Sequence, residues 1–151
     1  MKDILFRAKS NQSWYYGTLY YNGDENYYHD RSKHWYIVDK TDGIEAQINP
    51  NTICEFTGLT DKNGNKIFEN DIVRIGRYFT NNFLTEDNYI CIYNETTASF
   101  IFYYIIPKDT EKINIQAKLN DGVSIIDLGI GFTLEVIGNI FDTKELLEED
   151  G

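Results

Sequence analysis

Three oxygen-bearing side chains, Asp61, Asn63 and Asn65, alternate along one segment of the chain and are the residues best spaced to bind a metal ion. The same alternation opens an EF-hand loop, in which carboxylate and amide oxygens at the first, third and fifth positions bind calcium. That loop also needs glycine at its sixth position and a bidentate glutamate at its twelfth. Lys66 and Ile72 stand there instead. The sequence therefore argues against a calcium site.

The same segment, residues 57–73, has the residues of a series of tight turns. Asn63 and Gly64 are the favoured central pair of a type I′ hairpin turn, in which both residues have positive φ. Gly58 suits a second bend, and Glu69-Asn70-Asp71 suits a further turn before the next strand. We therefore predict a structural turn motif whose members are Thr57, Gly58, Asp61, Asn63, Gly64, Glu69 and Asp71.

Other arrangements that could support catalysis are incomplete. His29 and His34 are five residues apart in a polar stretch with no cysteine nearby, whereas zinc needs three or four ligands. Cys54 has no recognisable base to activate it, and its setting suggests a small core residue. The carboxylates Glu69 and Asp71 could serve acid–base chemistry but fit a solvated turn better. With no nucleophile elbow or phosphate loop present, we predict a protein without catalytic activity, cofactor or metal.

Aromatic pairs in the N-terminal part are the other candidate for function. Neighbouring residues on a strand point to opposite faces, so one member of each pair should face outward. Exposed tyrosines are good anchors for protein interfaces and can also stack on unpaired bases. Cross-strand packing within a sheet is the alternative use of the same rings. The candidate interface residues are Trp14, Tyr16, Tyr20, Tyr27 and Tyr28.

Many short strands must position these residues. Alternating apolar residues, separated by turn residues every eight to twelve positions, are typical of a small barrel or sandwich. The 100–106 run is apolar on both faces, which indicates a strand buried on both sides. The spacing predicts strands at residues 4–8, 14–21, 35–38, 44–48, 52–56, 72–75, 88–93, 99–106, 111–119, 123–128 and 132–140. Asp42-Gly43 and residues 120–122 are expected hairpin turns, and Gly129-Ile-Gly131 an expected bulge or bend.

The C-terminus has a helix signal. Asp142-Thr-Lys-Glu145 has the spacing of a capping box, and Leu146 and Leu147 would form one apolar face of a short helix. We expect one domain with three parts: a β-rich N-terminal part (1–56), a barrel part (57–141), and a short helix with an acidic tail (142–151).

Composition limits the possible partners and location. The 151 residues carry a net charge of −10, which disfavours direct binding to a phosphate backbone. Aromatic residues make up 15% of the chain, which favours strands. Two cysteines do not make a secreted disulfide scaffold, and no segment approaches the length of a membrane helix. We therefore expect a cytoplasmic protein.

Two ordered motifs give the chain a family resemblance. Residues 57–73 read TGLTDKNGNKIFENDIV, residues 135–141 read EVIGNIF, and residues 4–8 read ILFRA. This order resembles the YopX family of phage and prophage proteins over nearly the whole chain. Asn70 departs from the glycine usual in that family, but asparagine also tolerates left-handed geometry.

The resemblance implies a mixed, mainly β fold (α+β), with an SH3-like barrel in the C-terminal part and additional N-terminal strands. It also implies a phage or prophage gene in a Gram-positive host, without supplying an activity. Our leading hypothesis is a non-enzymatic accessory protein that acts through protein contacts or self-assembly as a homo-oligomer. Alternatives are an acidic inhibitor of a host nucleic-acid-binding or defence protein, a single-stranded nucleic-acid-binding barrel, and an unrecognised hydrolase.

Overall fold

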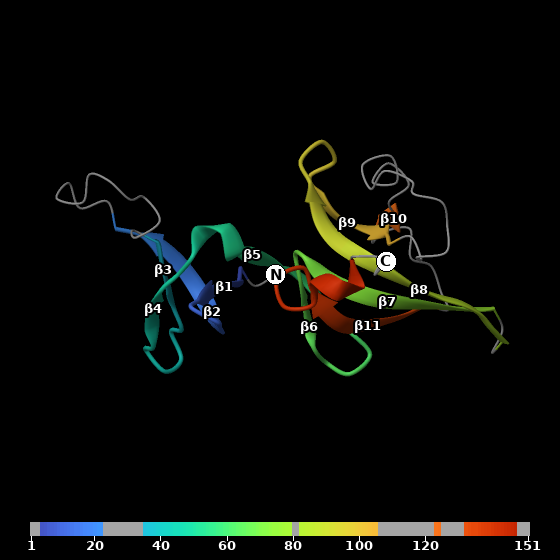
Figure 1. The fold of residues 1–151 in the computed structure, drawn as a ribbon, viewed down its shortest axis with the longest axis horizontal. Coiled ribbons are helices and arrows are strands. Elements are labelled where there is room, and N and C mark those ends of the chain that lie inside the picture. Colours follow the sequence, from blue (N-terminus) through green and yellow to red (C-terminus); the bar gives the residue numbers. More distant parts are fainter. Residues whose placement is uncertain (1–3, 23–34, 80–81, 106–122, 125–131, 148–151) are drawn as a thin grey trace. The chain divides into compact units, whose positions relative to one another are not determined.

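The chain folds into two compact units, residues 1–58 and residues 59–151 (Figure 1). The computed structural model describes residues 4–22, 35–79, 82–105, 123–124 and 132–147. Both units are built from antiparallel strands, so the fold is mainly β as predicted. Helix in these segments is limited to two single 3₁₀ turns, η2 (Pro50–Thr52) and η5 (Lys144–Leu146). None of the described helices is long and apolar enough to cross a membrane.

In the first unit, strands β1 to β4 form a meander, and β5 returns to pair with β1 at the other side of the sheet. Hydrogen bonds join the strands in the order β4-β3-β2-β1-β5. The predicted Asp42-Gly43 turn lies between β3 and β4, with Gly43 at φ +74°. The strands are β1 (Phe6–Ser10), β2 (Ser13–Tyr21), β3 (Trp35–Val38), β4 (Glu45–Gln47) and β5 (Cys54–Thr60).

Alternation along these strands gives the first unit its own core. Ala8, Ile37 and Ile48 are fully buried, and partly buried neighbours pack on them: Phe6, Tyr15, Leu19, Trp35, Ala46 and Ile53. Gly17 allows β2 and β3 to approach closely. Its φ is +156°, and a Cβ atom there would lie 2.0 Å from the carbonyl oxygen of Val38.

The second unit begins within β5, whose final residues continue past position 58. Strand β6 (Lys66–Phe68) is hydrogen-bonded to β5. A second sheet has the order β10-β9-β8-β7-β11, and its long strands β7 and β8 are prominent in Figure 1. Its strands are β7 (Asp71–Phe79), β8 (Asn82–Asn94), β9 (Ser99–Tyr104), β10 (Val123–Ser124) and β11 (Phe132–Asn139).

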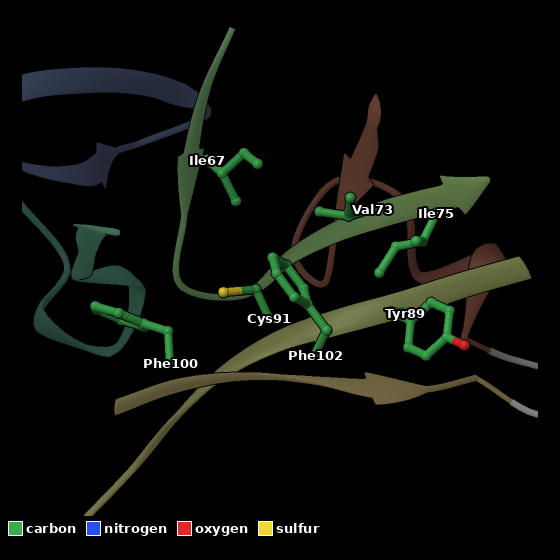
Figure 2. Packing of buried hydrophobic residues seen from close by; sticks show 7 residues of the cluster. All are labelled: Ile67, Val73, Ile75, Tyr89, Cys91, Phe100 and Phe102. Carbon is green, nitrogen blue, oxygen red and sulfur yellow. The ribbon is translucent and has the colours of Figure 1, made fainter. Parts of the chain in front are cut away.

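The core of the second unit fills the space between β6 and one face of this sheet. Figure 2 shows its seven buried side chains, Ile67, Val73, Ile75, Tyr89, Cys91, Phe100 and Phe102. Leu59, Tyr104, Phe132, Leu134 and Val136 pack against them. Four successive residues of β9, from Phe100 to Tyr103, are buried. The prediction that this strand is covered on both faces is therefore confirmed.

The structure does not show two of the predicted features, the SH3-like barrel and the C-terminal helix. The described strands form two open sheets rather than a closed barrel, so the SH3-like barrel stays a prediction. The expected C-terminal helix is not confirmed, because the described residues there form only the 3₁₀ turn η5. The Thr143 hydroxyl bonds back to the main chain of Asn139, and the Asp142 carboxylate accepts from the Asn139 amide. Both side chains are therefore turned away from helix capping.

Several predictions fall outside the described residues. They are the strand at 111–119, the turn at 120–122 and the bend at 129–131. Only Val123 and Ser124 are described from the predicted strand at 123–128.

Candidate functional site

The outward face of the first sheet carries the aromatic residues that sequence singled out. Tyr15 and Leu19 of β2 point into the first core, so Trp14, Tyr16 and Tyr20 lie on the opposite face. Tyr16 is 45% exposed and Tyr20 is 39% exposed, while Trp14 is half-buried. We name this surface, on the β2 side that carries Tyr16, the outward face.

Neighbouring strands complete the outward face with one further ring and one carboxylate. Tyr20 lies opposite Tyr36 of β3, and the two rings stack with centroids 5.1 Å apart and an interplanar angle of 13°. The Tyr20 hydroxyl donates a hydrogen bond to the carboxylate of Glu45 on β4. Stacking and this hydrogen bond therefore orient the Tyr20 ring on the sheet.

Two cations lie at the other side of the outward face, on β1. The guanidinium of Arg7 is 4.5 Å from the centre of the Trp14 ring, and the Lys9 ammonium is 5.2 Å from it. Both positions suit attraction between a cation and the electron-rich face of indole. Arg7 is only 5% exposed, whereas Lys9 is half-buried. The outward face is thus an aromatic surface with basic groups at one side and an acidic group at the other.

The aromatic residues proposed as an interface are only partly placed by the structure. Tyr27 and Tyr28 lie outside the described residues. Tyr36 belongs to the outward face but was not singled out, because only the strand register, which puts it opposite Tyr20, reveals its position. In the 20–21 pair both rings are exposed, and Tyr21 contacts the ring of Trp35 at 5.3 Å.

The Asp61 side chain organises the turn motif of the second unit. One carboxylate oxygen accepts the backbone N–H groups of Asn63 and Asn65, at 2.9 and 2.8 Å. The other accepts the N–H of Val136 on β11 at 2.9 Å and the Asn65 side-chain amide at 3.4 Å. Asp61 is 7% exposed. Its oxygens thus serve backbone donors, which is the role of a structural turn rather than of a calcium loop.

The pKa of Asp61 reflects this environment. Burial raises the pKa of the carboxyl group, but the N–H donors of Val136, Asn65 and Asn63 favour the charged form. The hydrogen bonds outweigh burial, and the pKa lies below its ordinary value. Asp61 is therefore ionised at neutral pH and stabilises the folded state in that form.

The turn at residues 61–65 is not of the predicted type I′. Only Gly64 has positive φ, at +84°, and Asn63 does not. The N–H of Gly64 donates to the carbonyl of Asp61 at 3.0 Å, and the N–H of Asp61 donates to the carbonyl of Asn65 at 2.8 Å. This is the pattern of a three-residue hairpin loop that ends in a left-handed glycine. The Asp61 side chain selects it by bonding two residues ahead.

The rest of the motif forms a bent strand and a second turn. Thr57 is buried in β5, and the exposed Gly58 next to it has φ +89°. Asn70 has φ +70°, so it adopts the left-handed geometry expected for this position, between Glu69 and Asp71. The Asp71 carboxylate accepts the N–H of Phe68 at 2.8 Å and so holds the turn between β6 and β7.

The two sequence motifs, 57–73 and 135–141, meet in the second unit. The Lys62 N–H donates to the carbonyl of Leu134 at 2.8 Å, and its ammonium pairs with Glu135 at 2.7 Å. The N–H of Ile140 donates to the carbonyl of Asn70 at 3.1 Å. The Lys62–Leu134 bond and the bond from Val136 to Asp61 lie on the edge of β11 away from β7, whereas the Ile140–Asn70 bond extends the pairing of β11 with β7. Sequence reasoning recognised both motifs but not that they touch.

The remaining candidate groups for chemistry are placed as follows. Cys54 and Cys91 are both buried thiols, and the Cys54 thiol donates to the carbonyl of Thr52 at 3.3 Å. His29 and His34 lie outside the described residues. Within the described segments, no group of three His, Cys, Asp or Glu side chains is arranged to hold a metal ion.

The negative charge of the chain is unevenly divided between the two units. The first unit has six Lys and Arg against eight Asp and Glu, a net charge of −2. The second has eight against sixteen, a net charge of −8. The acidity of the protein therefore belongs mainly to the second unit, and the outward face lies on the nearly neutral one.

Comparison with known proteins gives a family and no curated relative. The model of the family described as YopX protein matches residues 5–148, and no curated protein matches the chain. The matched range includes the aromatic strand, the turn motif and the C-terminal motif that contacts it. The chain belongs to the YopX family.

Proposed function

We propose that this chain is a non-enzymatic phage or prophage accessory protein that acts through protein contacts on the outward face of its first unit. The supporting observation is the exposure of Tyr16 and Tyr20 on one face of a sheet, with Trp14 and Tyr36 on the same face. Tyrosine and tryptophan are enriched at binding surfaces because they bury much area at little cost in side-chain entropy. The SH3-like barrel that the family resemblance implies for the C-terminal part belongs to this proposal.

Photo-crosslinking tests where the partner binds. A photoreactive amino acid at Thr18, exposed between Tyr16 and Tyr20 on the outward face, is compared with the same group at Thr41 in the exposed β3–β4 turn. We expect a covalent protein adduct from position 18 and none from position 41 after irradiation of the host cells. Mass spectrometry identifies the adduct as a second copy of the chain or as another protein.

The other outcomes contradict the proposal. An adduct made only with nucleic acid would favour the single-stranded nucleic-acid-binding alternative, and no adduct at position 18 would leave the outward face without a partner. Equal adducts from both positions would show contact by chance rather than a specific surface.

The division of charge favours a second candidate function, an acidic inhibitor of a basic host protein. The second unit carries a net charge of −8, which would attract a nucleic-acid-binding surface. The test measures how binding of the partner depends on salt. A partner held by this charge dissociates when the ionic strength rises from roughly 0.05 to roughly 0.5 M, because salt screens electrostatic attraction. A partner bound at the outward face through apolar contact remains bound.

A further inference from the structure

The outward face carries opposite charges on strands at its two sides. Lys9 of β1 lies opposite Trp14, and Glu45 of β4 lies opposite Val38, two strands away from Trp14. The exposed rings of Tyr16 and Tyr20 lie on β2 between them. The Lys9 ammonium lies over the Trp14 ring, and the Glu45 carboxylate accepts a hydrogen bond from the Tyr20 hydroxyl. Both charges therefore have defined positions.

Such a surface is complementary to itself. A two-fold axis that lies in the plane of the interface, and crosses the line from Lys9 to Glu45 at right angles, exchanges these two positions between facing copies. Each Lys9 then meets the partner's Glu45, and the tyrosines of the two copies meet in the middle. We propose that the occupant of the outward face is a second copy of this chain, bound in this two-fold arrangement; this rests on the proposed function and names its partner.

The charge distribution favours a second copy over a nucleic acid strand. Binding to a phosphate backbone needs several accessible cations. On the described outward face the cations are Lys9 and Arg7, and Arg7 is 5% exposed beneath the Trp14 ring. Glu45 at the other side of the face would repel phosphate. A second copy instead meets each charge with its opposite.

Net charge also makes the first unit the less costly place for two copies to meet. Two acidic chains repel each other, and that repulsion is strongest where the second units, at −8 each, approach. The first unit carries only −2. A two-fold interface is isologous, so one Lys9–Glu45 contact occurs twice in the dimer.

Charge reversal tests the arrangement, with dimerisation of the full chain measured by sedimentation. Lys9→Glu places two pairs of carboxylates together in its own dimer, and Glu45→Lys places two pairs of ammonium groups together. We expect each variant alone to weaken dimerisation by about tenfold or more, since like charges facing each other oppose association. An equimolar mixture of the two variants regains the wild-type affinity, because every contact in the mixed dimer is again between opposite charges.

Two controls keep folding and function apart from this result. Lys40→Glu changes the net charge by the same amount in an exposed turn and should leave dimerisation unchanged within a factor of about two. In the chain with both Lys9→Glu and Glu45→Lys, the two charges exchange places, so opposite charges still face each other across the interface. This double variant should dimerise like the wild type. This double variant also shows that either substitution is compatible with folding.

The proposal is overturned if the wild-type chain is monomeric at micromolar concentration, or if the mixture dimerises no better than the single variants. In either case, a crosslink from Thr18 to a different protein would leave the proposed function standing with another partner. A missing crosslink together with a monomeric chain would remove both.

Discussion

The outward face of the first unit and the motif contact of the second unit use their residues in contrasting ways. Tyr16 and Tyr20 are large apolar rings left open to solvent, although burial would stabilise them. Asp61 is a charged group enclosed among backbone donors, although burial of a charge is costly unless it is hydrogen-bonded. Both arrangements depart from the usual distribution of side chains, in which large apolar groups are buried and charged groups face solvent. The first departure leaves a surface available to a partner, and the second fixes the fold.

The two tryptophans make this contrast measurable. Trp14 and Trp35 both belong to the first unit, so tryptophan fluorescence reports on that unit alone. Far-ultraviolet circular dichroism reports on the strands of both units. Comparing the two signals during denaturation shows which unit a substitution destabilises.

Gly17→Ala should have the largest effect and should be confined to the first unit. The added methyl group would lie 2.0 Å from the carbonyl oxygen of Val38, and backbone must move to relieve it. We expect a loss of about 3 kcal/mol, at the upper end of the cost of overpacking. Tryptophan fluorescence in a denaturant titration measures it. Gly43→Ala is the control, since Gly43 also has positive φ but nothing lies within 4 Å of an added Cβ atom, and an equal loss there would remove steric contact as the cause.

Asp61→Ala should have the next largest effect, in the second unit. The substitution leaves the N–H groups of Asn63, Asn65 and Val136 without their acceptor. We expect a loss of about 2–3 kcal/mol, because three hydrogen bonds to a charged acceptor are lost at once. Circular dichroism should show an earlier transition while tryptophan fluorescence changes less. Asp42→Ala, which removes one exposed turn bond to Ile44, serves as control, and an equal loss from it would show that the contact with β11 adds nothing.

Gly138→Ala should cost less, because a side chain rather than backbone meets the new methyl group. A Cβ atom at Gly138 would lie 2.1 Å from the hydroxyl oxygen of Thr143. That hydroxyl bonds to the main chain of Asn139, so we expect about 1–2 kcal/mol of lost stability. In a Thr143→Ala background the penalty of Gly138→Ala should shrink. An unchanged penalty would place its cause in the backbone of β11.

The pH dependence of the Asp61 contribution should follow from its lowered pKa. A carboxyl group with a lower pKa in the folded state stabilises the protein above its unfolded pKa, roughly 4. That contribution is lost as the pH falls through the folded pKa. The stability difference between the wild type and Asp61→Asn should therefore be constant near neutral pH and diminish below about pH 4. A difference that is the same at all pH values would show that the charge of Asp61 contributes nothing.

Tyr16→Thr should have the smallest effect on folding. The ring is 45% exposed and lies on the outward face, so we expect a change within about 0.5 kcal/mol. Tyr15→Thr is the matched neighbour, because Tyr15 packs on the first core and should cost about 2–3 kcal/mol. Denaturant titrations followed by tryptophan fluorescence compare the two. Equal losses would mean that both rings serve packing and would weaken the case for an interface.

Local pattern predicted most of the strands but not β6 or the full length of β7 and β8, and it failed at the turn whose type depends on a distant residue. Alternation located β2, β3 and β9, and Asp42-Gly43 located a hairpin, because these depend on neighbouring residues. The type of the turn at Asn63 could not be predicted from Asn-Gly alone. Asp61 selects that turn, and one of its partners, Val136, is 75 positions away.

The candidate interface shows the same limit. Alternation along β2 correctly separated Tyr15 from Tyr16. It could not show that Tyr36 stacks on Tyr20, since that depends on the register between two strands. The C-terminal helix signal failed for a different, local reason: the Asp142 carboxylate accepts a hydrogen bond from the Asn139 side-chain amide three residues earlier, and that bond competes with helix capping.

The contact between Asp61 and Val136 has a consequence for the order of events during synthesis. The ribosome synthesises the 61–65 loop long before β11. The Val136 donor therefore arrives late, together with the rest of β11, which pairs with β7 in the sheet. Until then β7 presents an open strand edge, the kind of surface on which nascent chains aggregate. Chains interrupted before residue 132 should therefore be targets for chaperones or proteases, whereas release of the full chain closes β7 with β11 and covers the outer edge of β11 with the loop.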